Sequence, residues 1–226
     1  MPQPSTLLGG LALAAALAVP AQARDQAGAR IIMEHAGGRS EMLLQDTRAR
    51  VSPSRGDIYM LLDADSGQRL LVNTRQQRVV EMPARNPHGG DPKVEVELRR
   101  EGPGPEVAGY PTVRYVVRTG GQRCGSVLAS KEALADAGSQ GTARIFRMFS
   151  GEGRSGPNFT PDPCQRAFDA LPRHFGEIGL PLRTRLPEGG ASRVIRLETG
   201  VRFEPGTFSA PEDYERRSLK AVDGGE

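Results

Sequence analysis

Residues 94–99 read Val-Glu-Val-Glu-Leu-Arg, and this stretch is the clearest structural signal in the chain. Its apolar residues face one way and the charged residues between them face the other, which is the period of a half-buried β-strand. Residues 112–118, Thr-Val-Arg-Tyr-Val-Val-Arg, repeat that alternation. Strands with one apolar face predict an antiparallel sheet that is covered on one side.

Further strands are predicted on both sides of this pair. Short apolar runs bounded by turn signals predict strands at residues 31–34, 42–45, 58–62, 70–72, 79–82, 122–129, 182–186 and 193–198. The segment 101–105 is rich in glycine and proline and is expected to break the chain as a turn. From residue 214 onward the chain is charged and is expected to fray.

Helical signals cluster between residues 130 and 172. They predict a first helix at 131–137 after the capping residue Ser130, a second at 142–149, and a third from Asp162 to Pro172. The third begins with Asp-Pro, which combines a side-chain N-cap with a proline in the first helical turn. Strands, a helical insert and further strands predict one α+β domain with helices on one face of a large antiparallel sheet.

The first 23 residues have the pattern of a secretory signal. Residues 7–19 are almost wholly Leu, Ala, Gly and Val, and Ala21-Gln22-Ala23 follows as a small-x-small cleavage site. A buried alanine-rich helix is the alternative, and the run is shorter than the roughly 20 residues of a membrane-spanning helix. No cysteine lies directly after this apolar run to carry a lipoprotein anchor. We therefore expect a periplasmic protein with a domain at 24–215 and a charged flexible tail at 216–226.

Charge is nearly balanced over the 226 residues, with 30 basic and 27 acidic side chains and a net charge of +3. This balance excludes a strongly basic nucleic-acid binder, and no segment after the signal region is long and apolar enough to span a membrane. Most basic residues are arginines, and five lie on the late strands: Arg183, Arg185, Arg193, Arg196 and Arg202. They either form a basic face that contacts anionic lipid headgroups or belong to an ordinary solvated sheet face.

The chain has two cysteines, Cys124 and Cys164. Paired thiols of an exported protein usually form a disulfide in an oxidising compartment. Their separation of 40 residues makes no Cys-x-x-Cys motif and no zinc-ligand set. A structural disulfide is therefore predicted, with two unbonded thiols and a catalytic pair as the alternatives.

Patterns of catalytic residues are absent from the sequence. The three histidines, His35, His88 and His174, are scattered, and there is no Gly-x-Ser-x-Gly motif. Residues 151–156 match the dinucleotide-binding glycine pattern, but a proline-rich stretch follows where that mechanism requires a helix. We expect no enzyme activity, no cofactor and no metal site; a hydrolase would need His174 beside a serine and a carboxylate.

Three short motifs resemble the DUF4412-type domain of exported bacterial proteins, which is related to the LolA/LolB-like lipoprotein-carrier half-barrel. Residues 107–115 (VAGYPTVRY) resemble its entry into a central strand, 179–182 (GLPL) its turn before a late strand, and 207–214 (TFSAPEDY) its terminal signature. The resemblance covers most of residues 30–215, but Val127-Leu128 stand where many relatives have tryptophan. It implies an α+β fold with a curved antiparallel sheet and two or three helices inserted on the concave side.

The resemblance also implies a ligand site, because the concave cavity of the carrier relatives holds acyl chains. The candidate apolar lining is Val94, Val96, Leu98, Val113, Tyr115 and Val117 from the strands, with Ile145, Phe149 and Phe168 from the helices. The alternative is that these side chains pack together as a closed core. The expected function is non-catalytic binding of an apolar or lipid-like molecule; an envelope protein-interaction or sensory module without a small ligand is the alternative.

Overall fold

The computed structural model describes residues 27–83, 94–149, 162–186 and 190–219. Within these ranges one sheet of 12 strands has the order β12-β6-β5-β4-β3-β2-β1-β11-β10-β9-β8-β7. Neighbouring strands run antiparallel, apart from the parallel pair of β12 and β6. The expected signal segment lies outside the described residues.

The sheet is built from two antiparallel meanders that meet at the pairing of β1 with β11. The first meander consists of β1 (Gly28–His35), β2 (Gly38–Gln45), β3 (Arg48–Pro53), β4 (Ile58–Asp63), β5 (Gln68–Asn73) and β6 (Arg78–Met82). The second consists of β7 (Glu97–Val107), β8 (Tyr110–Thr119), β9 (Gln122–Ser130), β10 (Leu180–Arg185) and β11 (Ala191–Val201). The last strand, β12 (Glu215–Ser218), lies at the outer edge of β6.

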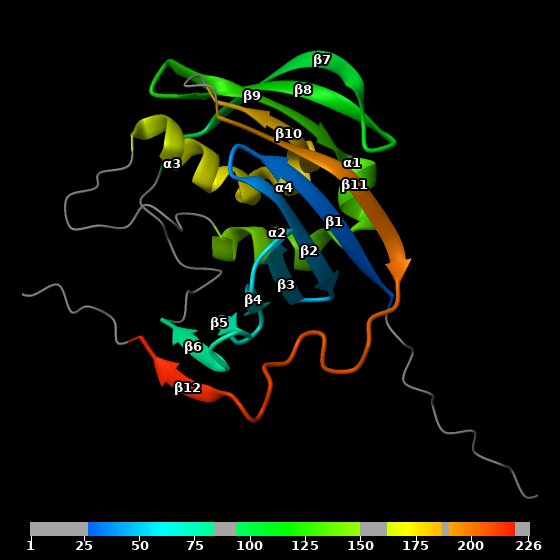
Figure 1. Cartoon of the computed structure of the whole chain (residues 1–226). Coiled ribbons are helices and arrows are strands. Elements are labelled where there is room, and N and C mark those ends of the chain that lie inside the picture. Colours follow the sequence, from blue (N-terminus) through cyan, green and yellow to red (C-terminus); the bar gives the residue numbers. More distant parts are fainter. Residues whose placement is uncertain (1–26, 84–93, 150–161, 187–189, 220–226) are drawn as a thin grey trace, which may run out of the picture.

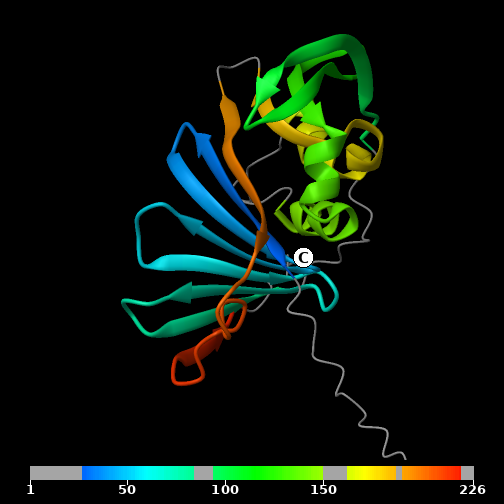
Figure 2. The ribbon, with the colours of Figure 1, turned by 90° about the vertical axis from the view of Figure 1, so that its right-hand side faces the viewer.

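The helices lie on the concave side of the curved, open sheet (Figures 1 and 2). They are α1 (Lys131–Asp136), α2 (Ser139–Phe149), α3 (Pro163–Ala170), the 3-10 helix η1 (Leu171–His174) and α4 (Phe175–Ile178). The predicted α+β class, with a curved antiparallel sheet and helices inserted on its concave side, is confirmed. The helical segment extends beyond Pro172, because proline is tolerated in the first turn of a new helix.

Two of the helix starts are capped as their sequences predict. The Ser130 hydroxyl accepts from the Ala133 N–H at 3.3 Å at the start of α1. At the start of α3, Asp162 Oδ1 accepts from the N–H groups of Cys164 and Gln165 at 2.7 and 3.1 Å. Each cap satisfies N–H groups that have no partner inside the helix.

The main hydrophobic core fills the space between the concave face and the helices. It includes Ile31, Val117, Ile145 and Phe175, none of them more than 2% exposed. A second, smaller cluster lies on the opposite face of the first meander and contains Tyr59, Leu61, Leu70, Val72 and Val79. Successive residues of a strand point to opposite faces, which is why Leu61 belongs to this cluster and its neighbour Leu62 to the main core.

The predicted strand at residues 94–99 is wrong in its position, because β7 spans 97–107. Pairing begins where Glu97 lies opposite Arg118, and β8 ends at Thr119, so the preceding residues have no partner strand. The turn expected at 101–105 is also wrong. Its prolines lie on an edge strand, where a missing N–H breaks no ladder on the outer side.

Two strands have no counterpart in the sequence prediction. In β3 only Ala49 is fully buried, so the strand shows no apolar alternation. The strand β12 is fully exposed and highly charged. Residues 216–218, the start of the expected flexible tail, belong to this strand. Its parallel pairing with residues 78–81 depends on a segment far away in the chain, which no local pattern records.

Candidate functional site

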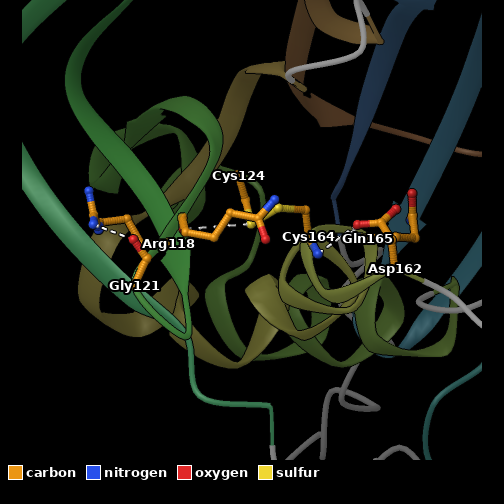
Figure 3. Close-up of a disulfide and its surroundings, with 7 residues drawn as sticks. Arg118, Gly121, Cys124, Asp162, Cys164 and Gln165 are labelled. Carbon is orange, nitrogen blue, oxygen red and sulfur yellow. Dashed lines mark hydrogen bonds between the residues drawn. A yellow bond between two sulfur atoms is a disulfide. The ribbon is translucent and has the colours of Figure 1, made fainter.

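The predicted disulfide joins β9 to α3 through Cys124 and Cys164 (Figure 3). The Cα atoms of the two cysteines are 4.9 Å apart. The helix packs closely here, because a Cβ at Gly125 would lie 3.1 Å from the ring of Phe168 and 2.1 Å from the Arg185 carbonyl oxygen. The bond anchors the helical insert to the sheet. Both cysteines of the chain are bonded, so neither is a free thiol.

The structure brings the nine candidate lining residues into or against the main core. Tyr115, Val117 and Ile145 are buried members of that core. Val94, Val96, Leu98, Val113, Phe149 and Phe168 are partly buried and pack against it. These side chains therefore belong to the packed interior. Phe168 also borders a cavity.

That cavity, called the apolar pocket below, lies between the helices and the concave face of β1, β10 and β11. Its volume is about 230 Å³. Its helical wall consists of Phe146, Phe168, Leu171, Pro172 and Phe175, and its sheet wall of Met33, Pro181, Leu182, Thr184, Leu186, Ser192, Arg193 and Val194. The pocket therefore lies at the centre of the half-barrel, where the two meanders meet.

The walls of the pocket present mainly carbon to its interior. Phe146 and Phe175 pack with ring centroids 5.4 Å apart at 59°. The two hydroxyl groups in the sheet wall bond each other, because the Thr184 and Ser192 oxygens are 2.6 Å apart, and Arg193 is the charged residue of that wall. A mainly apolar lining whose hydroxyl groups are paired with each other suits an apolar molecule.

Sequence reasoning missed the sheet wall of the pocket. The alternation of Leu182, Thr184 and Leu186 predicted the strand, and it also marks the residues that face the pocket. What the sequence does not indicate is the position of β10 and β11 beside β1 in the middle of the sheet. The strand part of the candidate lining was therefore assigned to residues 94–98 and 113–117, at or next to β7 and β8, which lie at one end of the sheet.

Arg144 anchors α2 next to the pocket. Its Nη1 donates to Asp65 Oδ1 at 2.7 Å and its Nη2 donates to the Ala64 carbonyl. Thr47 Oγ1 donates to the other carboxylate oxygen of Asp65 at 2.5 Å, and these bonds hold the pKa of Asp65 below its ordinary value. Burial, together with the nearby charges of Arg144 and Arg173, lowers the pKa of Arg147.

Among the described residues, no catalytic arrangement forms around His174. The nearest acidic group is Glu177, whose Oε2 lies 3.5 Å from His174 Nδ1. In the described ranges no serine is hydrogen-bonded to this histidine, and no group of three or more His, Cys, Asp or Glu side chains is placed to hold a metal ion. None of the described helices has the length and apolar character needed to cross a bilayer.

Comparisons with known proteins assign no family to the chain. No family model matches it, and no curated protein matches it. The relation to the DUF4412-type domain therefore stays a prediction.

Solved structures show distant likenesses. A crystal structure of MucB is 14% identical over 84% of this chain and 60% of that chain, with a TM-score of 0.42. The Pseudomonas aeruginosa MucA/MucB complex is 14% identical over 86% and 60%, with a TM-score of 0.45. The structure of PNGF-II is 12% identical over 87% and 31%, with a TM-score of 0.37. The chain thus spans about 60% of the MucB chains, and likenesses this distant assign it neither a ligand nor a partner.

Proposed function

We propose that this protein is an exported, non-catalytic binding protein that holds an apolar, lipid-like chain in the apolar pocket. The observation that carries the proposal is the pocket itself, a cavity walled by three phenylalanines on one side and by β10 and β11 on the other. Concave, mostly apolar cavities with few polar groups are the usual form of small-molecule sites.

The size of the pocket limits the occupant. Sites for drug-sized ligands have volumes of roughly 300–1,000 Å³, and this pocket has about 230 Å³. The occupant is therefore slender, such as a segment of one acyl chain. The same volume favours, as a second candidate, a single apolar side chain inserted by a protein partner.

Export to the periplasm is part of the proposal and is supported by two independent features. The pattern of residues 1–23 is typical of a secretion signal. The bonded pair Cys124–Cys164 suits an oxidising compartment, because cytosolic thiols are kept reduced.

The proposal is tested by binding of N-phenyl-1-naphthylamine, a dye that fluoresces in apolar surroundings, and by its displacement with dodecanoate. The variant Ser192→Phe places a ring in the pocket and is expected to weaken dye binding at least about tenfold, because it fills the site. Ser52→Phe is the matched control, since Ser52 is also half-buried but lies on β3, outside the pocket lining.

The result expected is saturable dye binding by the natural protein and by Ser52→Phe, competed by dodecanoate. Equal binding by both variants would place the dye elsewhere and overturn the pocket as the site. Absence of dye and dodecanoate binding by the natural protein would overturn the lipid-like ligand. Circular dichroism on both variants shows whether they fold.

A further inference from the structure

The convex face of the second meander carries a group of arginines, of which Arg193 also borders the apolar pocket. These are Arg114 on β8, Arg183 and Arg185 on β10, and Arg193 on β11, called the arginine face below. Their strand neighbours Tyr115, Thr184 and Val194 lie on the concave side, in the core or the pocket lining. Because side chains alternate along a strand, the four arginines point to the opposite face.

The sheet register places these arginines close together. Arg183 is directly opposite Arg193 in the β10–β11 pair. Leu128 on β9 is opposite Arg183 on one side and opposite Arg114 on the other. With about 4.8 Å between neighbouring strands, Arg114, Arg183 and Arg193 lie in one row about 15 Å long.

Several other arginines on strands of this sheet are ion-paired with acidic neighbours, and no such pair is formed by the arginine face within the described ranges. The pairs are Arg30 with Glu41 and Glu198, Arg196 with Glu198, Arg99 with Glu101 and Arg118 with Glu97. Glu34, which lies opposite Arg193, pairs instead with Arg39 at 3.5 Å. Within the described ranges the four arginines form no ion pair, so this face carries uncompensated positive charge.

Stability does not account for this arrangement, because like charges directly opposite in a sheet are destabilising. The face also lacks an apolar centre. Val116 and Leu128 are only 1% and 7% exposed, and the large exposed hydrophobic residues of the described chain, Ile58 and Leu219, lie elsewhere. Protein interfaces usually have an apolar core, so the arginine face fits a dense anionic surface better than a protein partner.

We propose that the arginine face docks the protein on an anionic lipid surface. Guanidinium groups form charge-assisted, often paired hydrogen bonds with phosphate oxygens, and basic clusters are attracted to anionic headgroups. Docking through this face leaves the concave side, with its apolar pocket, directed away from the lipid. The inference stands on the convex arginines, and vesicle binding tests it without a ligand in the pocket.

The test is cosedimentation of the protein with vesicles of phosphatidylglycerol and phosphatidylcholine, compared with vesicles of phosphatidylcholine alone. The test variant is the triple substitution R114Q/R183Q/R193Q. The control is R39Q/R196Q/R217Q, which removes the same number of positive charges from exposed arginines that are ion-paired with Glu34, Glu198 and Glu215. Both triples therefore have the same net charge.

The natural protein is expected to bind the anionic vesicles, to lose that binding as salt is raised, and to ignore the neutral vesicles. The R114Q/R183Q/R193Q variant should bind at least about tenfold more weakly, and the control within about threefold of the natural protein. The thermal midpoint of R114Q/R183Q/R193Q should be unchanged or higher, because R183Q and R193Q remove a like-charge contact.

Equal loss in both triples would show attraction by net charge alone and overturn the inference. Vesicle binding that R114Q/R183Q/R193Q leaves intact would overturn it too. So would binding of a poly-glutamate peptide without binding of anionic vesicles, since that result assigns the face to an acidic protein segment. If the triple variant does not fold, the single variant R183Q is used in its place, and its thermal midpoint is measured to show that it folds.

Discussion

Gly141 lies in α2 directly against the turn between β2 and β3. A Cβ at this position would lie 1.8 Å from the Asp46 carbonyl oxygen, which is backbone and cannot swing aside. Asp46 itself has a φ of 54°, so the turn is already in the left-handed region. The helix approaches the sheet this closely only because residue 141 has no side chain.

We predict that Gly141→Ala destabilises the fold by about 1–3 kcal/mol through overpacking. Helix propensity alone predicts the opposite sign, a gain of about 1 kcal/mol. The matched control is Gly176→Ala in α4, where a Cβ would have nothing within 4 Å, and this variant should be neutral or slightly stabilising. Urea unfolding of both variants is the measurement, and a stabilised Gly141→Ala would contradict the packing argument.

Asp65 predicts a pH dependence of stability. Hydrogen bonds from Thr47 and Arg144 lower the pKa of its carboxyl group from the ordinary 3.8. A lowered pKa in the folded state means that the carboxylate stabilises the fold above about pH 4, and that this contribution is lost as the pH falls through the folded pKa. Asp65→Asn should therefore lower the urea midpoint at pH 7 and lose less stability than the natural protein between about pH 4 and pH 2. Parallel acid profiles of the two proteins would contradict this assignment.

At the scale of elements, the segment after β11 forms a strap over the convex face of the first meander. Phe203 and Phe208 pack edge to face with centroids 5.2 Å apart, and the Arg48 guanidinium lies 5.5 Å from the Phe208 ring centre. Further along, Tyr214 packs on the second hydrophobic cluster. The strap ends in β12, where the Glu215 N–H donates to the Gln77 carbonyl at 2.9 Å.

We predict that Tyr214→Ala destabilises the protein by about 1–3 kcal/mol, because it uncovers apolar surface on β4, β5 and β6. Hydrogen exchange at residues 78–81 should accelerate in the same variant, since those residues pair with β12. Leu219→Ala is the control: that side chain is 54% exposed, and its removal should change stability by less than about 0.5 kcal/mol. If the two variants were equally stable, the strap would not cover the cluster in solution.

At the scale of the whole molecule, the disulfide links the helical insert to the sheet across 40 residues. We predict that the double variant Cys124→Ser/Cys164→Ser loses about 2–5 kcal/mol of unfolding free energy, measured by urea denaturation. Loss of the bond lets the unfolded chain sample more conformations, so the folded state is disfavoured. Addition of a reductant to the natural protein should reproduce the shift and leave the double variant unchanged. Equal midpoints for the natural and double-variant proteins would contradict a stabilising role.

Local patterns predicted much of the fold and little of the site. The strand at 58–62, the N-caps Ser130 and Asp162, and the disulfide were read correctly, because each depends on a few neighbouring residues or on the pairing of two cysteines. The edge strand β7 was misplaced, because its limits are set by the length of its partner β8. The sheet wall of the pocket was missed because it depends on which strands become neighbours, and no local pattern records this.

The sequence by itself determined that alternating apolar residues form sheet faces, that helices start at capped positions, and that two cysteines are available to bond. Tertiary structure alone decided that β1 pairs with β11, some 160 residues away in the chain, and so placed the apolar pocket on one face and three arginines in a row on the other. The physical reason is that alternation is a property of one strand, whereas a pocket or a charged face exists only once separate strands have been brought side by side.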